Sequence, residues 1–175
     1  MNLNSRYLID ANVFIQAKNF HYRFGFCQGF WQWLIEAHQA GLVFSIDKVR
    51  QEINDGNKDD KVRLWADDLP DGFFIPDAHD NAVMQAYRQV MQWNVSNHHY
   101  RQQAKDEFAR FDKADAFLIA AAKAHGFTVV THEASKPESK KRVLIPDAAN
   151  QFDIESIMIY DLLSQYATGN FALSL

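Results

Sequence analysis

This sequence has a single cysteine, a small net charge and no long hydrophobic run, and each of these features excludes a class of protein. The single cysteine, Cys27, cannot form a disulfide within the chain and has no cysteine partner for a zinc site. The formal net charge of -4 gives no overall positive field, so nucleic-acid binding would require a local basic patch. No apolar run approaches the roughly 20 residues of a membrane span, and the N-terminus lacks a signal pattern. We therefore expect a cytoplasmic protein with no membrane partner.

Apolar and aromatic residues, in contrast, are plentiful. Of the 175 residues, 47% are hydrophobic and 14% are aromatic, which is enough for a full core and argues against disorder. No internal repeat and no low-complexity linker divides the sequence. Residues 1–175 are therefore predicted to form a single domain.

Short strand-like runs alternate with helical periodicity along the chain. Residues 6–10, 42–46 and 127–131 are predicted to be buried strands. A further strand is predicted at residues 143–145, where Pro146 stops it. The alternation predicts an α/β fold with a mainly parallel sheet. Helices are expected at residues 11–18, around 30–37, from 47 onward, and at 61–69, 80–93, 101–110, 114–125 and 154–166.

Three other stretches carry local predictions. Asp47 is expected to cap the helix that follows it. Residues 135–142 are expected to form a basic loop without regular structure. The tail after Gly169 is expected to fray, with contact to a partner as the alternative.

Four acidic residues stand where core residues are expected. Asp10 ends the first strand, Glu52 follows the second, and Glu133 follows the strand at 127–131. Asp115 projects from an apolar helical face. Carboxylates at the ends of parallel strands and at the starts of adjacent helices converge on one edge of the sheet. Because such a cluster repels itself, it requires a cation, and all-oxygen ligands favour Mg²⁺ or Mn²⁺ over zinc.

Each acid also has a purely structural alternative, which the sequence leaves open. Asp10 could cap the following helix, and Glu52 could be a solvated helix residue. Asp112 and Asp115 resemble an N-cap and its N3 acid. Glu133 could be a loop acid that pairs with a nearby lysine.

In their order, the acidic segments resemble the motifs of PIN domains. The resemblance is to the bacterial PIN-like nucleases that include VapC-type toxins. It is greatest to a largely uncharacterised PIN-like subgroup whose last motif is Thr-x-Glu, so Glu133 departs from the usual Thr-x-Asp pattern. The segments that carry the resemblance are residues 8–14, 45–53, 113–122 and 131–133.

The resemblance implies a fold, an activity and partners. The implied fold is a three-layer α/β/α arrangement, and the implied activity is Mg²⁺- or Mn²⁺-dependent cleavage of RNA by the toxin of a toxin–antitoxin pair. An antitoxin and a homodimer are implied as partners. Asp10, Glu52 and Asp115 would hold the metal, with Glu133 as the fourth catalytic acid.

Supporting roles follow from the same matching positions. Asn12 and Thr131 would orient ligands or water. Asp112 is an additional acid that would serve beside or instead of Asp115. Basic side chains near the acids would steer phosphates, with a solvated surface as the alternative reading. These are Arg50, Lys113, Lys140, Lys141 and Arg142.

Two other functions fit parts of the pattern. A catalytically silent PIN-like scaffold would bind RNA or protein, but it has no need to retain a repulsive acid cluster. A phosphohydrolase with an aspartyl nucleophile usually has a second acid two residues after the first, and after Asp10 that position is Asn12. We therefore predict a metal-dependent ribonuclease.

Overall fold

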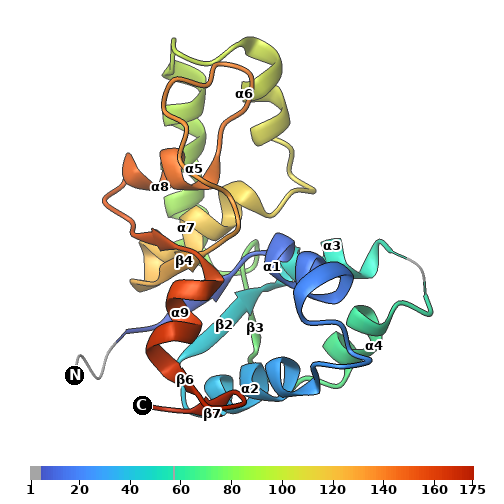
Figure 1. Cartoon of the computed structure of the whole chain (residues 1–175). Helices are drawn as coiled ribbons and strands as arrows, with labels where there is room; N and C mark the ends of the chain where they lie inside the picture. The colour runs from blue at the N-terminus through green and yellow to red at the C-terminus, as the bar shows by residue number, and fades with distance from the viewer. Residues whose placement is uncertain (1–4, 57) are drawn as a thin grey trace.

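A parallel sheet of five short strands runs through the larger lobe of the molecule (Figure 1). The computed structural model describes residues 5–56 and 58–175, and the strand count refers to these residues. The strands are β1 (Tyr7–Ile9), β2 (Val43–Ile46), β3 (Phe74–Ile75), β4 (Thr128–Val130) and β5 (Ser156–Ile157). Their order is β3-β2-β1-β4-β5, with every neighbouring pair parallel. The carboxyl ends of all five strands therefore meet at one edge.

Helices flank this sheet, so the α/β fold with a parallel sheet and a three-layer α/β/α arrangement is confirmed (Figure 1). The sheet is covered because β1 and β4 are almost entirely apolar and buried. No helix within the described residues is long and apolar enough to cross a membrane. The helices are α1 (Ala11–Gln16), the π-helix η1 (Ala17–His21), α2 (Gln28–Gln39), α3 (Asp47–Asn54), α4 (Lys61–Asp67), α5 (Asn81–Ser96), α6 (Gln102–Phe108), α7 (Asp115–His125), α8 (Ile145–Asn150) and α9 (Ile159–Tyr166).

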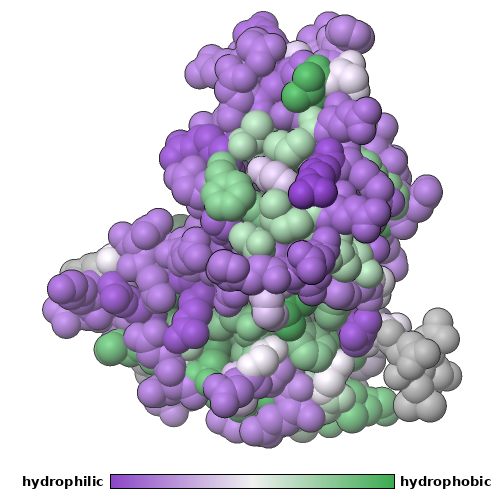
Figure 2. Space-filling view, turned by 180° about the vertical axis from the view of Figure 1, so that it is seen from behind, coloured by the Kyte–Doolittle hydropathy of each residue, from purple (hydrophilic) through white to green (hydrophobic). Residues whose placement is uncertain are grey.

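A smaller hydrophobic cluster lies apart from the main core and supports the second lobe. It includes Val90 of α5, Phe108 of α6 and Ile119 of α7. Helix α7 belongs to both clusters because it is buried on all sides from Ala116 to Ala122. From behind, hydrophilic residues dominate the outline of the molecule and hydrophobic residues gather towards the middle of the face (Figure 2). Helix α7 therefore joins the two lobes, and its first residue lies between them.

The strand predicted at residues 143–145 is wrong. Ile145 begins α8, and Pro146 lies in the first turn of that helix, where its fixed φ and missing N–H are well tolerated. The edge strand of the sheet is instead β5, which lies inside the helix predicted at 154–166. Helix α9 begins only at Ile159. Backbone pairing with β4 therefore overrides the helical periodicity of residues 154–157.

The predicted cap of α3 is also wrong. Asp47 is the first residue of the helix, and Ile46 occupies the N-cap position without a side-chain bond. The distant Asp77 supplies the bond, because its carboxylate accepts from the Lys48 backbone N–H at 2.6 Å. A cap from another segment leaves no local sequence signal.

The C-terminal tail folds back rather than fraying. β6 (Ala167–Thr168) and β7 (Ala172–Leu173) form an antiparallel hairpin. Phe171, at the turn, lies edge-on to Tyr22 at 5.6 Å and to Phe30 at 6.1 Å between ring centroids. The prediction of fraying at residues 170–175 missed this aromatic packing.

Candidate active site

Asp10 lies at the carboxyl end of β1 with only 3% of its surface exposed. Its backbone N–H donates to the carbonyl of Val130 at 2.9 Å, which continues the pairing with β4. Asp10 occupies the N-cap position of α1, but its side chain makes no capping bond. The carboxylate oxygen Oδ2 instead accepts from the Thr131 hydroxyl at 2.9 Å. The helix-cap alternative is therefore wrong.

A short hydrogen-bond network fixes this end of the sheet. Asn12 Nδ2 donates to Thr131 Oγ1 at 2.9 Å, and Asn12 Oδ1 accepts from the His132 backbone N–H at 3.0 Å. The Glu133 N–H also donates to Thr131 Oγ1, at 3.2 Å. Thr131 Oγ1 thus accepts two hydrogen bonds while its own hydrogen is directed to Asp10. Asn12 and Thr131 are placed where supporting residues were expected.

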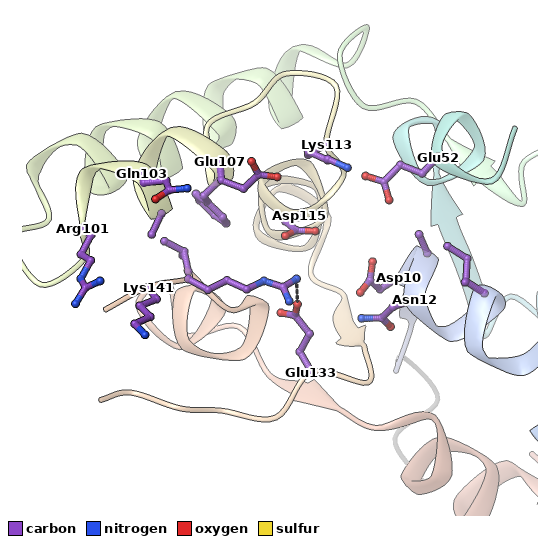
Figure 3. Close-up of a pocket in the computed structure, with 16 residues that line it drawn as sticks. Asp10, Asn12, Glu52, Arg101, Gln103, Glu107, Lys113, Asp115, Glu133 and Lys141 are labelled. Carbon is purple, nitrogen blue, oxygen red and sulfur yellow. Dashed lines mark hydrogen bonds and ion pairs between the residues drawn. The ribbon is translucent and has the colours of Figure 1, made fainter. Parts of the chain in front are cut away.

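The other three acids reach the same cavity from separate segments. Glu52 projects from α3 and accepts the N–H of Ala114 at 2.9 Å, at the start of α7. Asp115 is the first residue of α7, and Glu133 follows β4. Together with Asp10 they line a cavity of about 550 Å³ (Figure 3). The tertiary fold therefore brings all four predicted acids to one place.

Both carboxylate oxygens of Glu133 are engaged. Oε2 accepts from the Ile145 backbone N–H at 2.8 Å, and Oε1 pairs with the Arg142 guanidinium at 2.5 Å. The Glu133 side chain is 9% exposed, whereas that of Arg142 is 63% exposed. The longer acid is therefore anchored by the start of α8, and Arg142 lies over it at the rim of the cavity.

Burial and mutual repulsion dominate the electrostatics of the cavity. Burial raises the pKa of Asp10 well above its usual range, and the charge of Asp115 raises it further. The hydrogen bond from Thr131 acts in the opposite direction. Burial, followed by the charges of Glu133 and Glu52, raises the pKa of Asp115 to about 7. Burial and repulsion therefore both disfavour the ionised forms of Asp10 and Asp115.

Basic side chains line the cavity on more than one side. Lys113, Lys141 and Arg142, which the sequence predicts to steer phosphates, are among the lining residues. Arg101, the N-cap residue of α6, also lines the cavity. Figure 3 shows Lys113 towards Glu52, and Arg101 and Lys141 on the side opposite Asp10 and Asn12. Sequence reasoning missed Arg101 because nothing local distinguishes it from any other helix-end arginine. Arg101 lines the cavity because of where α6 packs in the second lobe.

Besides Thr131, which is buried behind Asp10, three of the predicted residues lie outside the cavity lining. Asp112 forms an ion pair with Arg110 at 2.6 Å, which lowers the pKa of Asp112. Ala114 occupies the N-cap position of α7, so the capping-box reading of Asp112 is wrong. Arg50 pairs with Asp67 at 3.5 Å, on the outer surface. Lys140 contributes its backbone carbonyl, which accepts from the Arg101 N–H at 2.9 Å.

The carboxylate oxygens of the cavity are the ligands that a hard divalent cation prefers, but the acids are too far apart in this structure to hold one ion together. Across residues 5–56 and 58–175, no three Asp, Glu, His or Cys side chains lie close enough to hold one ion together. Mg²⁺, however, usually retains several waters and takes only one or two protein carboxylates. Asp10 and Asp115 are the pair that fits direct ligation, because Asp10 is buried, Asp115 is half-buried at the start of α7, and the charge of Asp115 raises the pKa of Asp10. Glu52 and Glu133 fit contact through water.

Comparison with known proteins gives one match. A protein family described as a domain of unknown function (DUF4411) has a sequence model that matches residues 7–169. No curated protein and no solved structure shows significant similarity to the chain. The matched range includes all four of the predicted acids.

Proposed function

Because the chain belongs to the DUF4411 family, whose function is unknown, we propose from the site itself that it is a Mg²⁺- or Mn²⁺-dependent endoribonuclease of PIN type. One observation carries this proposal: four acids from α3, α7 and the ends of β1 and β4 line one cavity that basic residues border. Acids suit cation binding and basic residues suit phosphates, and a phosphodiester hydrolase needs both. The further assignment as the toxin of a toxin–antitoxin pair, with an antitoxin and a second copy as partners, rests on the PIN resemblance alone.

The residues of the chain have separate tasks in this proposal. Asp10 and Asp115 would hold the cation, with Glu52 and Glu133 as further acids of the same site. A bound Mg²⁺ or Mn²⁺ supplies positive charge that stabilises the charge developing on the phosphate, and it makes water a better nucleophile. Thr131 holds the Asp10 carboxylate in one orientation through its 2.9 Å hydrogen bond.

The basic side chains bind the strand on either side of the attacked phosphate. Arg142 lies next to Glu133 and is largely exposed, so it can rotate from the carboxylate to a phosphate oxygen, while Glu133 keeps the hydrogen bond from the Ile145 backbone N–H. Lys113 lines the cavity on the α7 side. The two positive groups therefore bracket the acids.

Cleavage of single-stranded RNA by purified protein with Mn²⁺ tests the proposal. We expect Asp10→Asn to lower the rate by at least about 100-fold, because it removes a buried ligand oxygen. Asp112→Asn is the matched control, since Asp112 lies nearby but outside the cavity, and it should retain the wild-type rate. Equal cleavage by the wild type and Asp10→Asn, or none by the wild type, would refute the proposal.

A catalytically silent RNA- or protein-binding scaffold is the second candidate. The observation in its favour is that no three potential ligands in the described part of the chain are close enough to hold one ion directly. This alternative requires RNA binding without metal-dependent cleavage. The cleavage experiment, run beside a binding measurement, separates the two candidates.

A further inference from the structure

Aromatic rings gather beside the acidic cavity on three segments that leave the same edge of the sheet. His132 lies two residues after the end of β4, and Tyr160 lies in the first turn of α9, just after β5. His21 ends η1, which continues α1 beyond β1. Ring centroids are 5.5 Å apart for His132 and Tyr160, and 6.2 Å apart for Tyr160 and His21. Phe20 extends the row, 6.4 Å from His21. We call these four residues the aromatic ledge.

The ledge is exposed, unlike most of the aromatic packing in this protein. Phe20 is 61% exposed and Tyr160 is 40% exposed. Its rings are also tilted or edge-on to one another, at 58° for His132 with Tyr160 and 75° for Tyr160 with His21. A core pair such as Phe24 and Trp31 is stacked at 13°, so each ring covers a face of the other. The ledge rings do not cover one another in this way, and the exposed surface of Phe20 and Tyr160 is open to a planar ligand.

The ledge lies next to the acidic cavity. The His132 backbone N–H donates to Asn12 Oδ1, and Asn12 lines the cavity. Ile15, one turn further along α1, also lines the cavity and is 37% exposed. The basic residues Arg101 and Lys141 lie on the opposite side from Asn12 (Figure 3). The acids therefore have a positively charged wall on one side and an aromatic surface on the other.

We propose that the aromatic ledge is a base-stacking subsite for the nucleotides next to the phosphate that occupies the acidic cavity. This inference rests on the proposed function in one respect, because it requires a phosphodiester strand at the acids. A nucleobase has a flat apolar face, and stacking on aromatic side chains accommodates any base. The strand would thus run from the basic wall, across the acids, to Tyr160 and Phe20. The ligand class is single-stranded nucleic acid, since paired bases cannot offer their faces.

Binding without divalent metal isolates this subsite from catalysis. The probes are a fluorescent single-stranded RNA of about eight nucleotides and an abasic ribose-phosphate strand of the same length, both in EDTA. We expect the wild type to bind the base-bearing strand about tenfold more tightly than the abasic one. Tyr160→Ala should lose about tenfold in affinity for the base-bearing strand and nothing for the abasic one. Tyr160→Phe should retain wild-type affinity because it keeps the ring.

A matched control and a second variant keep the test decisive. Phe26→Ala removes an aromatic side chain outside the ledge that is even more exposed than Tyr160, at 69% against 40%, and it should bind as the wild type does. His21→Ala replaces Tyr160→Ala if a thermal melt shows that the latter does not fold. Three results would each overturn the base-stacking proposal. The wild type could bind the two strands equally, it could bind neither strand, or Tyr160→Ala and Phe26→Ala could have equal affinities. The last result is also what an aromatic ledge built for a protein partner would give.

The two proposals fail in different ways. If the protein cleaves RNA with Mn²⁺ but binds both strands equally, the base-stacking proposal is wrong and the nuclease proposal stands. If binding depends on the bases and on Tyr160 but no cleavage occurs with Mn²⁺, the nuclease proposal is wrong and the base-stacking proposal stands.

Discussion

The Thr131 hydroxyl donates to Asp10 Oδ2 at 2.9 Å, across the ends of β4 and β1. The side-chain amide of Asn12 and the backbone N–H of Glu133 both donate to Thr131 Oγ1. These two donors occupy the acceptor positions of the hydroxyl, so its hydrogen is directed to Asp10. One buried threonine therefore orients the most deeply buried acid of the cavity and ties it to the segment that carries Glu133.

Thr131→Val tests this relationship because it keeps the shape of the side chain and removes the hydroxyl. We expect the free energy of unfolding to fall by about 1–3 kcal/mol, since the variant leaves the Asn12 amide and the Glu133 N–H without their acceptor. Chemical denaturation measures this change. Thr168→Val, at an exposed position of the C-terminal hairpin, is the control and should change stability by less than about 0.5 kcal/mol. Equal effects at the two positions would show that the network does not stabilise the fold.

Asp115→Asn is expected to stabilise the metal-free protein in a pH-dependent way. The folded-state pKa of Asp115, about 7, lies above the ordinary aspartate pKa of about 3.9, so the folded state binds more protons between these values. Wild-type stability therefore falls as pH rises from about 4 to 7 and stays lowered above that range. The variant lacks this ionisation, so its advantage should be absent near pH 4 and reach about 1 kcal/mol or more at pH 8.

Thermal melts of both proteins across this pH range measure the difference. Asp112→Asn is the control, because Arg110 lowers the pKa of Asp112 and no advantage that grows with pH is expected there. An Asp115→Asn advantage that does not change with pH would contradict the repulsive-cluster explanation.

Divalent metal should reverse the repulsion. A ligand that binds only the folded state raises the free energy of unfolding by about 2.7 kcal/mol at 100 times its Kd. We therefore expect millimolar Mn²⁺ to raise the melting temperature of the wild type and of Asp112→Asn, but not that of Asp10→Asn. A melting temperature that Mn²⁺ leaves unchanged in all three proteins would favour the silent scaffold.

Arg142→Ala should weaken substrate binding more than it weakens the fold. The side chain is 63% exposed, so loss of its ion pair with Glu133 should cost less than about 1 kcal/mol of stability. Loss of a charge-assisted phosphate contact should raise KM about tenfold and reduce the slope of log affinity against log salt by about 1. Arg50→Ala is the matched control, because Arg50 pairs with Asp67 outside the cavity. Equal KM changes for the two variants would indicate a diffuse charge effect instead of a contact at the site.

Local chemistry determined much of the fold. The apolar run at residues 7–9 forms a buried strand because it has no polar face, and α7 ends at Gly126 because glycine adopts the left-handed conformation, with φ at 70°, at little cost. Acids placed directly after strands were visible in the sequence, and parallel pairing requires that such positions share one edge. The α/β class and the four candidate acids therefore followed from patterns a few residues long.

Contacts between distant segments decided the rest. The helix-forming pattern at residues 154–157 gave way to β5 because β4 offered backbone partners there, and α3 took its cap from Asp77 of another segment. Arg101 reached the acids because α6 packs in the second lobe, and the aromatic ledge arose where three separate segments meet at one edge of the sheet. The sequence by itself determined which residues carry charge and where strands and helices begin to form, since these depend on neighbours along the chain. Only the tertiary structure decided which charges and rings face one another, because that depends on the packing of the whole core.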